Sequence, residues 1–261
     1  MIVTTAGKFN AGLIEKARSA AAAIQARFVN RGRDSIQTLK EQHNDDVVMI
    51  GKNKTVYHAL HSDEPFFFHP NSSMFRAKQW LRGEGDPLIK AAKIQPGSSF
   101  LDCTLGLGSD STMASLAAGP AGKVIGIEES EAVRMIVTSG LSIWETGIKE
   151  MDDAMRRVRV LSGNHLEILR SLPNESYDIV YFDPMFESTI HESAGLSGLK
   201  TVASYSCLTK EAIEEACRVA KKRVVLKENR VSPLFKEHHF NVIPRSSKFW
   251  YGTIEKEQSD V

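Results

Sequence analysis

Apolar runs and helix-forming segments alternate along the chain from about residue 98 to residue 227. The apolar runs predict strands, which fall at residues 98–103, 123–128, 156–161, 177–183 and 222–227. The segments between them predict helices, which fall at residues 110–118, 130–146, 164–172 and 209–220. Strands that alternate with helices in this way indicate a parallel sheet. Two later apolar runs, at 240–243 and 248–254, are joined by a short connection and predict a terminal hairpin.

The first 75 residues do not follow that alternation. Their pattern predicts two helices and two short strands, at residues 12–27, 34–43, 46–51 and 55–59. We therefore expect a small α/β N-terminal module at residues 1–75, followed by a main domain at residues 76–261. The aromatic run at 65–71 has two interpretations: it packs the module onto the main domain, or it offers a surface on which bases stack.

Composition narrows the class of protein. The chain has 261 residues, of which 42% are hydrophobic and 25% charged, and its formal net charge is +1. These values are typical of a globular protein and show no overall basic field that would attract nucleic acid. Three scattered cysteines, Cys103, Cys207 and Cys217, form no CxxC pair, so we expect no disulfide framework, no metal site and a reducing cytoplasm. We see no signal peptide and no apolar window of transmembrane length, so no membrane association is expected.

A glycine-rich turn follows the first predicted strand of the main domain. Asp102 ends that strand, Gly106 and Gly108 form the turn, and Ser109-Asp110-Ser111 begin the next helix. Glycine lets the backbone turn sharply and lets a ligand approach closely. Glu128 ends the following strand, 22 residues after Gly106, where a carboxylate can accept both hydroxyls of a ribose. This order is typical of a Rossmann-like unit that binds a nucleotide-type cofactor.

A second motif, Asp183-Pro184-Met185-Phe186, follows the strand predicted at 177–183. Ligands bind outside the carboxyl ends of strands in such sheets, so this loop should face the same crevice as Gly106 and Glu128. An ordinary Asp-Pro turn is the alternative. The functional interpretation is methylation of a planar amine. Asp183 and the carbonyl of Pro184 would accept its two hydrogens, and the ring of Phe186 would stack on the base.

The glycine-rich turn resembles motif I of the class I S-adenosylmethionine-dependent methyltransferases. In that family an acidic residue, here Asp102, precedes the loop under the methionine part of the cofactor. The NAD fingerprint is not met, because its third glycine would fall at Ser111. The resemblance implies the Rossmann-like class I methyltransferase fold, a mostly parallel seven-stranded sheet with a C-terminal antiparallel hairpin, and S-adenosyl-L-methionine as cofactor.

Residues 76–230 resemble, more narrowly, the bacterial family of small-subunit (16S) ribosomal RNA guanine-N2 methyltransferases. The similarity lies in four segments, at 82–92, 102–110, 183–186 and 223–227. They resemble that family's Gly-rich segment before a Lys-Ala helix, its Asp-x-Thr-x-Gly-Leu-Gly-x-Asp turn, its Asp-Pro-Met-aromatic loop and its Arg-Val-Val-x-Lys strand. The resemblance implies an exocyclic amine of a base in rRNA as substrate, and hence RNA as partner.

The same resemblance implies roles for individual residues. Ser109 and Asp110 would contact the cofactor at the turn, and Glu128 and Glu129 would bind its ribose. Asp183 would face both the cofactor and the substrate amine.

Two residues would then lie near the adenine, Asn164 and His165. Asn164 is equally suited to cap the helix predicted at 164–172, and the two roles are compatible. His165 is otherwise a surface residue of that helix's first turn.

The chain also departs from that family. After the Asp-Pro-Met-aromatic loop the family continues with a basic run, whereas residues 187–192 here are acidic. An acidic lip repels phosphate, and we interpret residues 187–206 as a lid that could exclude RNA. Arg27, Arg31 and Arg33 could guide RNA instead, and Lys227 is expected at the crevice rim, where it would meet a phosphate or a substrate acid. The alternatives are methylation of a small molecule or protein side chain, and a non-catalytic Rossmann-like module that binds RNA or protein.

Overall fold

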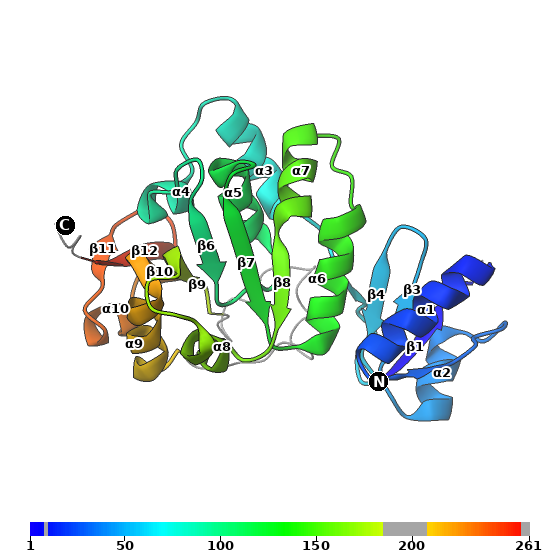
Figure 1. The fold of residues 1–261 in the computed structure, drawn as a ribbon. Helices are drawn as coiled ribbons and strands as arrows, with labels where there is room; N and C mark the ends of the chain where they lie inside the picture. Colours follow the sequence, from blue (N-terminus) through cyan, green and yellow to red (C-terminus); the bar gives the residue numbers. More distant parts are fainter. Residues whose placement is uncertain (8–9, 185–207, 257–261) are drawn as a thin grey trace. The chain divides into compact units, whose positions relative to one another are not determined.

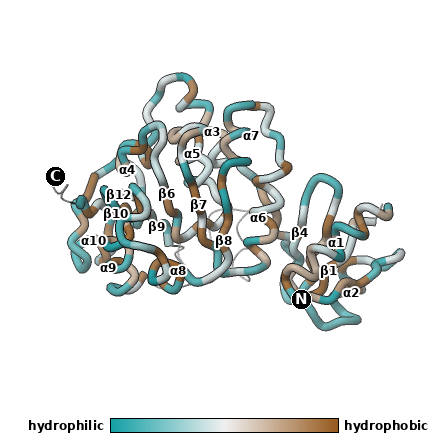
Figure 2. Tube along the Cα trace, viewed as in Figure 1, coloured by the Kyte–Doolittle hydropathy of each residue, from teal (hydrophilic) through white to brown (hydrophobic). Residues whose placement is uncertain are grey.

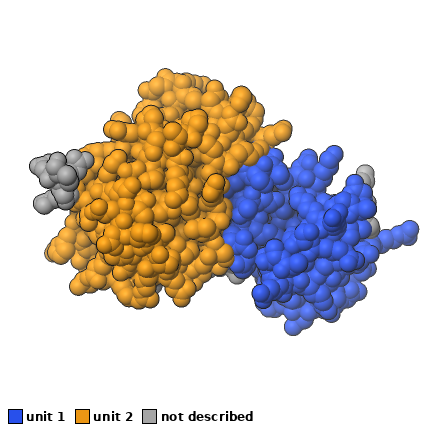
Figure 3. Space-filling model, in the orientation of Figure 1, with its two compact units in different colours: residues 1–69, 130–144, 186–204 blue, residues 70–129, 145–185, 205–261 orange. Residues whose placement is uncertain are grey.

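The computed structural model describes residues 1–7, 10–184 and 208–256. The chain forms two compact units, coloured separately in Figure 3. Unit 1 is built from the described parts of residues 1–69 and 130–144. Unit 2 is built from the described parts of residues 70–129, 145–185 and 205–261. The domain boundary between residues 75 and 76 stays a prediction.

Unit 2 contains a seven-stranded sheet in the order β11-β12-β10-β9-β6-β7-β8 (Figure 1). The strands are β6 (Ser99–Asp102), β7 (Lys123–Glu128), β8 (Arg159–Ser162), β9 (Tyr177–Phe182), β10 (Ala220–Asn229), β11 (Asn241–Ile243) and β12 (Phe249–Glu255). Strands β6 to β10 pair in parallel, whereas β12 pairs antiparallel with both β10 and β11. The predicted parallel sheet with a C-terminal antiparallel hairpin is therefore confirmed.

Helices cover both faces of this sheet. The helices of unit 2 are α3 (Asn71–Leu81), α4 (Pro87–Ala92), α5 (Ser109–Ala118), α7 (Lys149–Arg157), α8 (His165–Ser171), α9 (Lys210–Val219) and α10 (Leu234–Glu237). Helix α5 packs on β6 and β7 and contacts α3, α4 and α7, while α8 and α9 contact each other and α9 packs on β9 and β10.

Strand residues alternate between these two helical layers. Leu101, Val180 and Phe182 belong to the buried cluster that includes residues of α9. Phe100 and Tyr181, one position away, stack against each other with ring centroids 5.4 Å apart. Strand β7 is among the most hydrophobic segments in Figure 2, because it is covered on both faces, as expected of a parallel strand.

Two boundaries differ from the prediction. The helix predicted at 130–146 ends at Ile143 as α6 (Glu131–Ile143), and a separate helix, α7, then covers residues that we had not predicted to be helical. The strand predicted at 156–161 begins only at Arg159, because Arg156 and Arg157 form the last turn of α7. Basic side chains suit that position, since they face the negative end of the helix dipole.

Unit 1 contains a five-stranded sheet in the order β2-β1-β3-β4-β5. Its strands are β1 (Ile2–Thr5), β2 (Arg27–Phe28), β3 (Val47–Ile50), β4 (Thr55–His58) and β5 (Phe66–Phe67), and its helices are α1 (Ala11–Ala23), α2 (Ile36–His43) and α6. Both predicted helices and both predicted strands of this region are present. Strand β1 was not predicted, although its four residues are all buried.

The aromatic run lies partly in the interior of unit 1. Phe66 and Phe68 are buried, and the Phe68 ring meets Trp144 edge-on with centroids 5.9 Å apart. The base-stacking interpretation is therefore wrong for these two rings. No helix in the described ranges is long and apolar enough to cross a membrane.

Candidate active site

The predicted site residues follow neighbouring parallel strands, whose order in the sheet is β9-β6-β7-β8. Their carboxyl ends share one edge of the sheet, where ligands bind in folds of this type. The fold therefore brings to this edge Asp183 and Pro184 after β9, Asp102 to Asp110 after β6, Glu128 and Glu129 at the end of β7, and Asn164 and His165 after β8. Phe186 and the acidic segment 187–206 lie outside the described residues.

The backbone between β6 and α5 turns sharply, as its glycines predicted. Gly106 and Gly108 have φ values of 50° and 70°, a region that side chains disfavour. The turn is tied to the sheet by the Leu105 N–H, which donates to the Ile127 carbonyl at 3.1 Å. Helix α5 begins after Gly108 with no side-chain cap. The first N–H groups of α5 are therefore not satisfied by a capping side chain, and such a helix start suits polar or anionic ligand groups.

Asp102 is buried under this turn. Its carboxylate accepts hydrogen bonds from the Ser111 hydroxyl at 2.7 Å and from the Thr104 N–H at 3.0 Å. Burial raises the pKa of Asp102 to about 7, although both hydrogen bonds oppose the rise. A buried carboxyl group with a raised pKa at this edge of the sheet is typical of a ligand-binding group.

The ends of β7 and β8 carry a looser set of groups. Glu128 is half-buried and Glu129 is exposed. Asn164 caps α8 through the Leu166 N–H at 2.9 Å, and its amide donates to Glu129 at 3.3 Å. Asn164 thus fills the predicted capping role while lying next to a predicted ribose ligand.

His165 is buried rather than on the surface, which corrects the surface interpretation. Its ring meets Phe182 edge-on at 5.8 Å. Burial lowers the pKa of His165, against the opposing effect of Glu129. The imidazole therefore favours the neutral form.

Asp183 lies directly after β9 and is fixed at two points. Its backbone N–H donates to the Thr104 hydroxyl at 2.6 Å, and its Oδ2 accepts from Lys227 at 2.5 Å. Burial and the nearby Asp110 raise the pKa of Asp183 to about 6, although Lys227 opposes the rise. The carboxylate is therefore mostly ionised at neutral pH and can accept hydrogen bonds.

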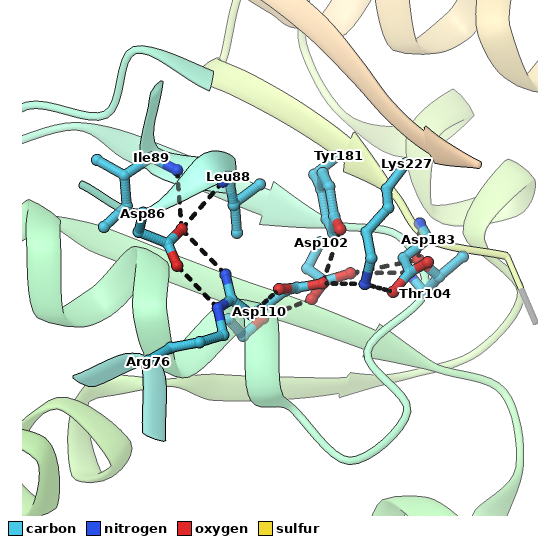
Figure 4. Close-up of polar contacts among 11 residues, drawn as sticks. Arg76, Asp86, Leu88, Ile89, Asp102, Thr104, Asp110, Tyr181, Asp183 and Lys227 are labelled. Atoms are coloured by element: carbon cyan, nitrogen blue, oxygen red, sulfur yellow. Dashed lines mark hydrogen bonds and ion pairs between the residues drawn. The ribbon is translucent and has the colours of Figure 1, made fainter. Parts of the chain in front are cut away.

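A chain of ion pairs extends from Asp183 into the protein (Figure 4). Lys227 also contacts Asp110 Oδ2 at 3.1 Å, which in addition accepts from the Tyr181 hydroxyl at 2.7 Å. Arg76 pairs with Asp110 Oδ1 through one nitrogen, and with both oxygens of Asp86 through the others, at 2.8 and 3.0 Å. Burial would raise the pKa of Asp110, but Lys227 and Arg76 lower it well below its usual range.

Comparisons with known proteins identify the family of the chain. A family model described as "Putative SAM-dependent methyltransferase" matches residues 65–250. The chain belongs to this family of S-adenosylmethionine-dependent methyltransferases. "Uncharacterized protein YpiP" of Bacillus subtilis (strain 168) is 40% identical over 97% of this chain and 99% of its own length.

One curated relative and one solved structure are more distantly similar to this chain. "Ribosomal RNA small subunit methyltransferase J" of Pseudomonas syringae pv. tomato is 31% identical over 58% of this chain, and the match spans only 56% of that protein. The crystal structure of the SAM-dependent methyltransferase NGO1261 from Neisseria gonorrhoeae superposes with a TM-score of 0.62 at 17% identity, over 100% of this chain and 98% of that one. That likeness shows the Rossmann-like methyltransferase fold.

The site fits the cofactor of this methyltransferase family, S-adenosylmethionine. The helix start without a side-chain cap, the open glycine turn and the carboxylates after β6 and β7 supply the acceptors and N–H groups that a nucleoside with an amino-acid tail needs. Within the described ranges, no group of three or more His, Cys, Asp or Glu side chains could hold a metal ion.

Sequence reasoning placed Lys227 at the crevice of this methyltransferase but assigned it the wrong partners. Lys227 does not await a phosphate, because Asp110 and Asp183 already occupy its ammonium group. Both oxygens of Asp110 are engaged as well, so cofactor contact through its side chain stays a prediction. Arg76 was missed, whereas Asp86 had a local signal, since Asp followed by Pro87 is typical of a helix start.

Proposed function

We propose that this methyltransferase methylates an exocyclic amine of a base in ribosomal RNA. The observation that carries the proposal is the environment of Asp183 at the end of β9. Its ionised carboxylate accepts a hydrogen bond from Lys227, while its backbone N–H donates to the Thr104 hydroxyl beside the glycine turn. Asp183, Pro184 and Phe186 are the residues proposed to act on the substrate.

The chemistry explains why a carboxylate suits this position. An exocyclic amine on a ring is a weak nucleophile, because its lone pair is delocalised into the ring. Asp183 and the Pro184 carbonyl would accept its two hydrogens and favour a pyramidal nitrogen, while Phe186 would hold the base by stacking. S-adenosylmethionine supplies an electrophilic methyl group when bound, so the protein's main task is alignment.

The cofactor-binding residues are likewise a proposal. At the turn they are Asp102, Gly106, Gly108, Ser109 and Asp110, and along the sheet edge they are Glu128, Glu129, Asn164, His165 and Asp183. The two carboxylates at the end of β7 would take the ribose, and the residues after β8 would lie near the adenine. Their common position at the carboxyl ends of adjacent strands supports this assignment.

RNA as substrate is supported by the named relatives and by the Asp-Pro-Met-aromatic motif. The relatives named for ribosomal RNA match just over half of their own length. The formal net charge of +1 provides no general attraction to RNA, so recognition would depend on local groups. An rRNA substrate implies that the proposed reaction occurs in the cytoplasm.

The test is transfer of a tritiated methyl group from S-adenosylmethionine. The purified protein is incubated separately with 16S rRNA, with assembled small subunits and with small amines. The rRNA and the subunits are prepared from cells that lack this gene. Incorporation into one base of the rRNA, absent for Asp183→Ala, is the expected result. Incorporation only into small amines or into protein would overturn the RNA proposal and leave the methyltransferase class intact.

A further inference from the structure

The two carboxylate oxygens of Asp183 lie in different surroundings. Oδ2 accepts a hydrogen bond from the Lys227 ammonium group at 2.5 Å. Oδ1 receives no hydrogen bond from any residue that the structure describes. The backbone of Asp183 is held separately, by its N–H bond to Thr104 at 2.6 Å. Within the part of the chain that the structure describes, only Oδ2 is therefore committed to another residue.

Lys227 is itself anchored on the side away from Asp183. Its ammonium lies 3.1 Å from Asp110 Oδ2, which also accepts the Tyr181 hydroxyl. Asp110 is held in turn by Arg76, whose remaining nitrogens bind Asp86. Figure 4 shows the Lys227 ammonium between the two carboxylates. Because lysine has three donors and no acceptor, this anchoring makes Lys227 a fixed donor at the transfer site.

We propose that Lys227, anchored by Asp110, is a positioning residue that binds Oδ2 of Asp183 and so leaves Oδ1 as the one oxygen that accepts from the reacting amine. The inference rests on the proposed function, because it takes an amine as the reacting group. A carboxylate paired with an ammonium group accepts strong hydrogen bonds. The methylated amine carries one surplus proton, which Oδ1 can accept and pass to water.

The amide variant Asp183→Asn exposes this role. An amide has one acceptor oxygen and one NH₂ donor. With Lys227 present, the oxygen must turn to the ammonium, and the NH₂ then faces the donor hydrogens of the substrate amine. Without Lys227, the amide is free to turn its oxygen to the substrate. Lys227→Met should therefore harm the native enzyme but help the Asp183→Asn enzyme.

Methyl transfer by four proteins tests this reversal: the wild type, Asp183→Asn, Lys227→Met and the double variant. We expect Asp183→Asn to lose about a hundredfold in rate, and the double variant to recover about tenfold relative to Asp183→Asn. A double variant no faster than Asp183→Asn overturns the proposal. Lys222→Met is the matched control, because Lys222 lies on the same strand and pairs with Asp178 at 3.0 Å, away from Asp183.

A second readout needs no substrate. The pKa of the Asp183 carboxyl is measured by ¹³C NMR titration in the wild type, Lys227→Met and Lys222→Met. Among the described residues, the titratable groups that act on Asp183 are Lys227, Asp110, Asp102, Tyr181, Tyr251 and Glu228. Loss of the one cation among them should raise the pKa by about one unit, whereas Lys222→Met should leave it unchanged.

These readouts separate the two proposals. An unmoved Asp183 pKa in Lys227→Met shows that Lys227 does not hold this carboxylate, and it overturns the inference even if rRNA is methylated. A raised pKa in an enzyme that methylates no RNA supports the placement of Lys227 while the proposed function fails. Calorimetric titration with S-adenosylmethionine verifies that each variant is folded.

Discussion

The two ends of the sheet edge that forms the site are built differently. At the β9–β10 end, Asp183, Lys227, Asp110, Arg76 and Asp86 form one continuous set of ion pairs. At the β7–β8 end, the carboxylates are half-buried or exposed, and the Asn164–Glu129 bond measures 3.3 Å. One end is fixed from within the protein, and the other is in contact with solvent.

This difference matches what each end is proposed to do. Buried charges are costly unless they are paired, so an ion-pair network is retained where geometry must be held closely, as at a transfer site. The network contains three carboxylates and two cations, and its surplus negative charge suits a cationic ligand such as a sulfonium. Ribose hydroxyls need acceptors but no fixed charge, and groups in contact with solvent suffice for them.

Removal of the Asp183 carboxylate should have the largest effect. We expect Asp183→Ala to reduce methyl transfer by about a thousandfold, because both acceptor geometry and charge are lost at the reacting amine. Affinity for S-adenosylmethionine should stay within about tenfold, as measured by calorimetry. An equal loss of affinity and transfer would instead identify Asp183 as mainly a cofactor ligand. Asp153→Ala, at an exposed position on α7, is the control.

Loss of Arg76 tests whether the network holds the fold as well as the site. Among the described residues, Arg76→Ala leaves the buried carboxylate of Asp86 without its cation and Asp110 with Lys227 as its one remaining cation. Removal of one partner of a buried pair is strongly destabilising, and we expect a loss of about 3 kcal/mol in the free energy of unfolding by urea. The control is Lys149→Ala, which breaks the exposed pair with Asp153 and should leave stability unchanged. Equal stability of the two variants would contradict the role assigned to the network.

The same contrast explains what the sequence could reveal. Most strands of unit 2 were predictable because they are bounded apolar runs, and the residues at their ends followed from the rule for parallel sheets. Asp102, Glu128 and Asp183 were located in this way. Helix α3 was missed because it buries only Ser73 and Ala77 and exposes Phe75, so it shows no apolar stripe.

The ion-pair network had no signal of its own. Arg76 and Asp110 are separated by 34 positions and meet only because α3 packs on α5. The place of Lys227 depends on β10 lying beside β9 and β12, and no local pattern fixes the register of these strand pairs. Long-range pairing of charges is a property of packing, whereas strand ends and glycine turns are properties of local sequence.

At the solvent-exposed end, Glu128→Gln tests the proposed ribose contact. We expect affinity for S-adenosylmethionine to fall by about tenfold, which corresponds to about 1.4 kcal/mol, because the amide keeps one acceptor but replaces the other with a donor. The rate at saturating cofactor should change little. Glu129→Gln, one position along, is the matched comparison. A larger loss in Glu129→Gln would transfer the main ribose contact to that residue.

The smallest expected effect concerns Asp102, which lies between the two ends. Burial raises its pKa to about 7 in the folded protein, above the usual value of about 3.9 for an unfolded chain. The folded state therefore binds a proton that the unfolded state has released, so this group's contribution to stability decreases as the pH rises through that interval. Asp102→Asn cannot ionise at this position. Between about pH 6 and about pH 8, we therefore expect the free energy of unfolding of the wild type to fall by about 1 kcal/mol relative to that of Asp102→Asn. Urea unfolding of both proteins across this range measures the difference, and parallel curves would show that the Asp102 carboxyl is already ionised under its turn at pH 6.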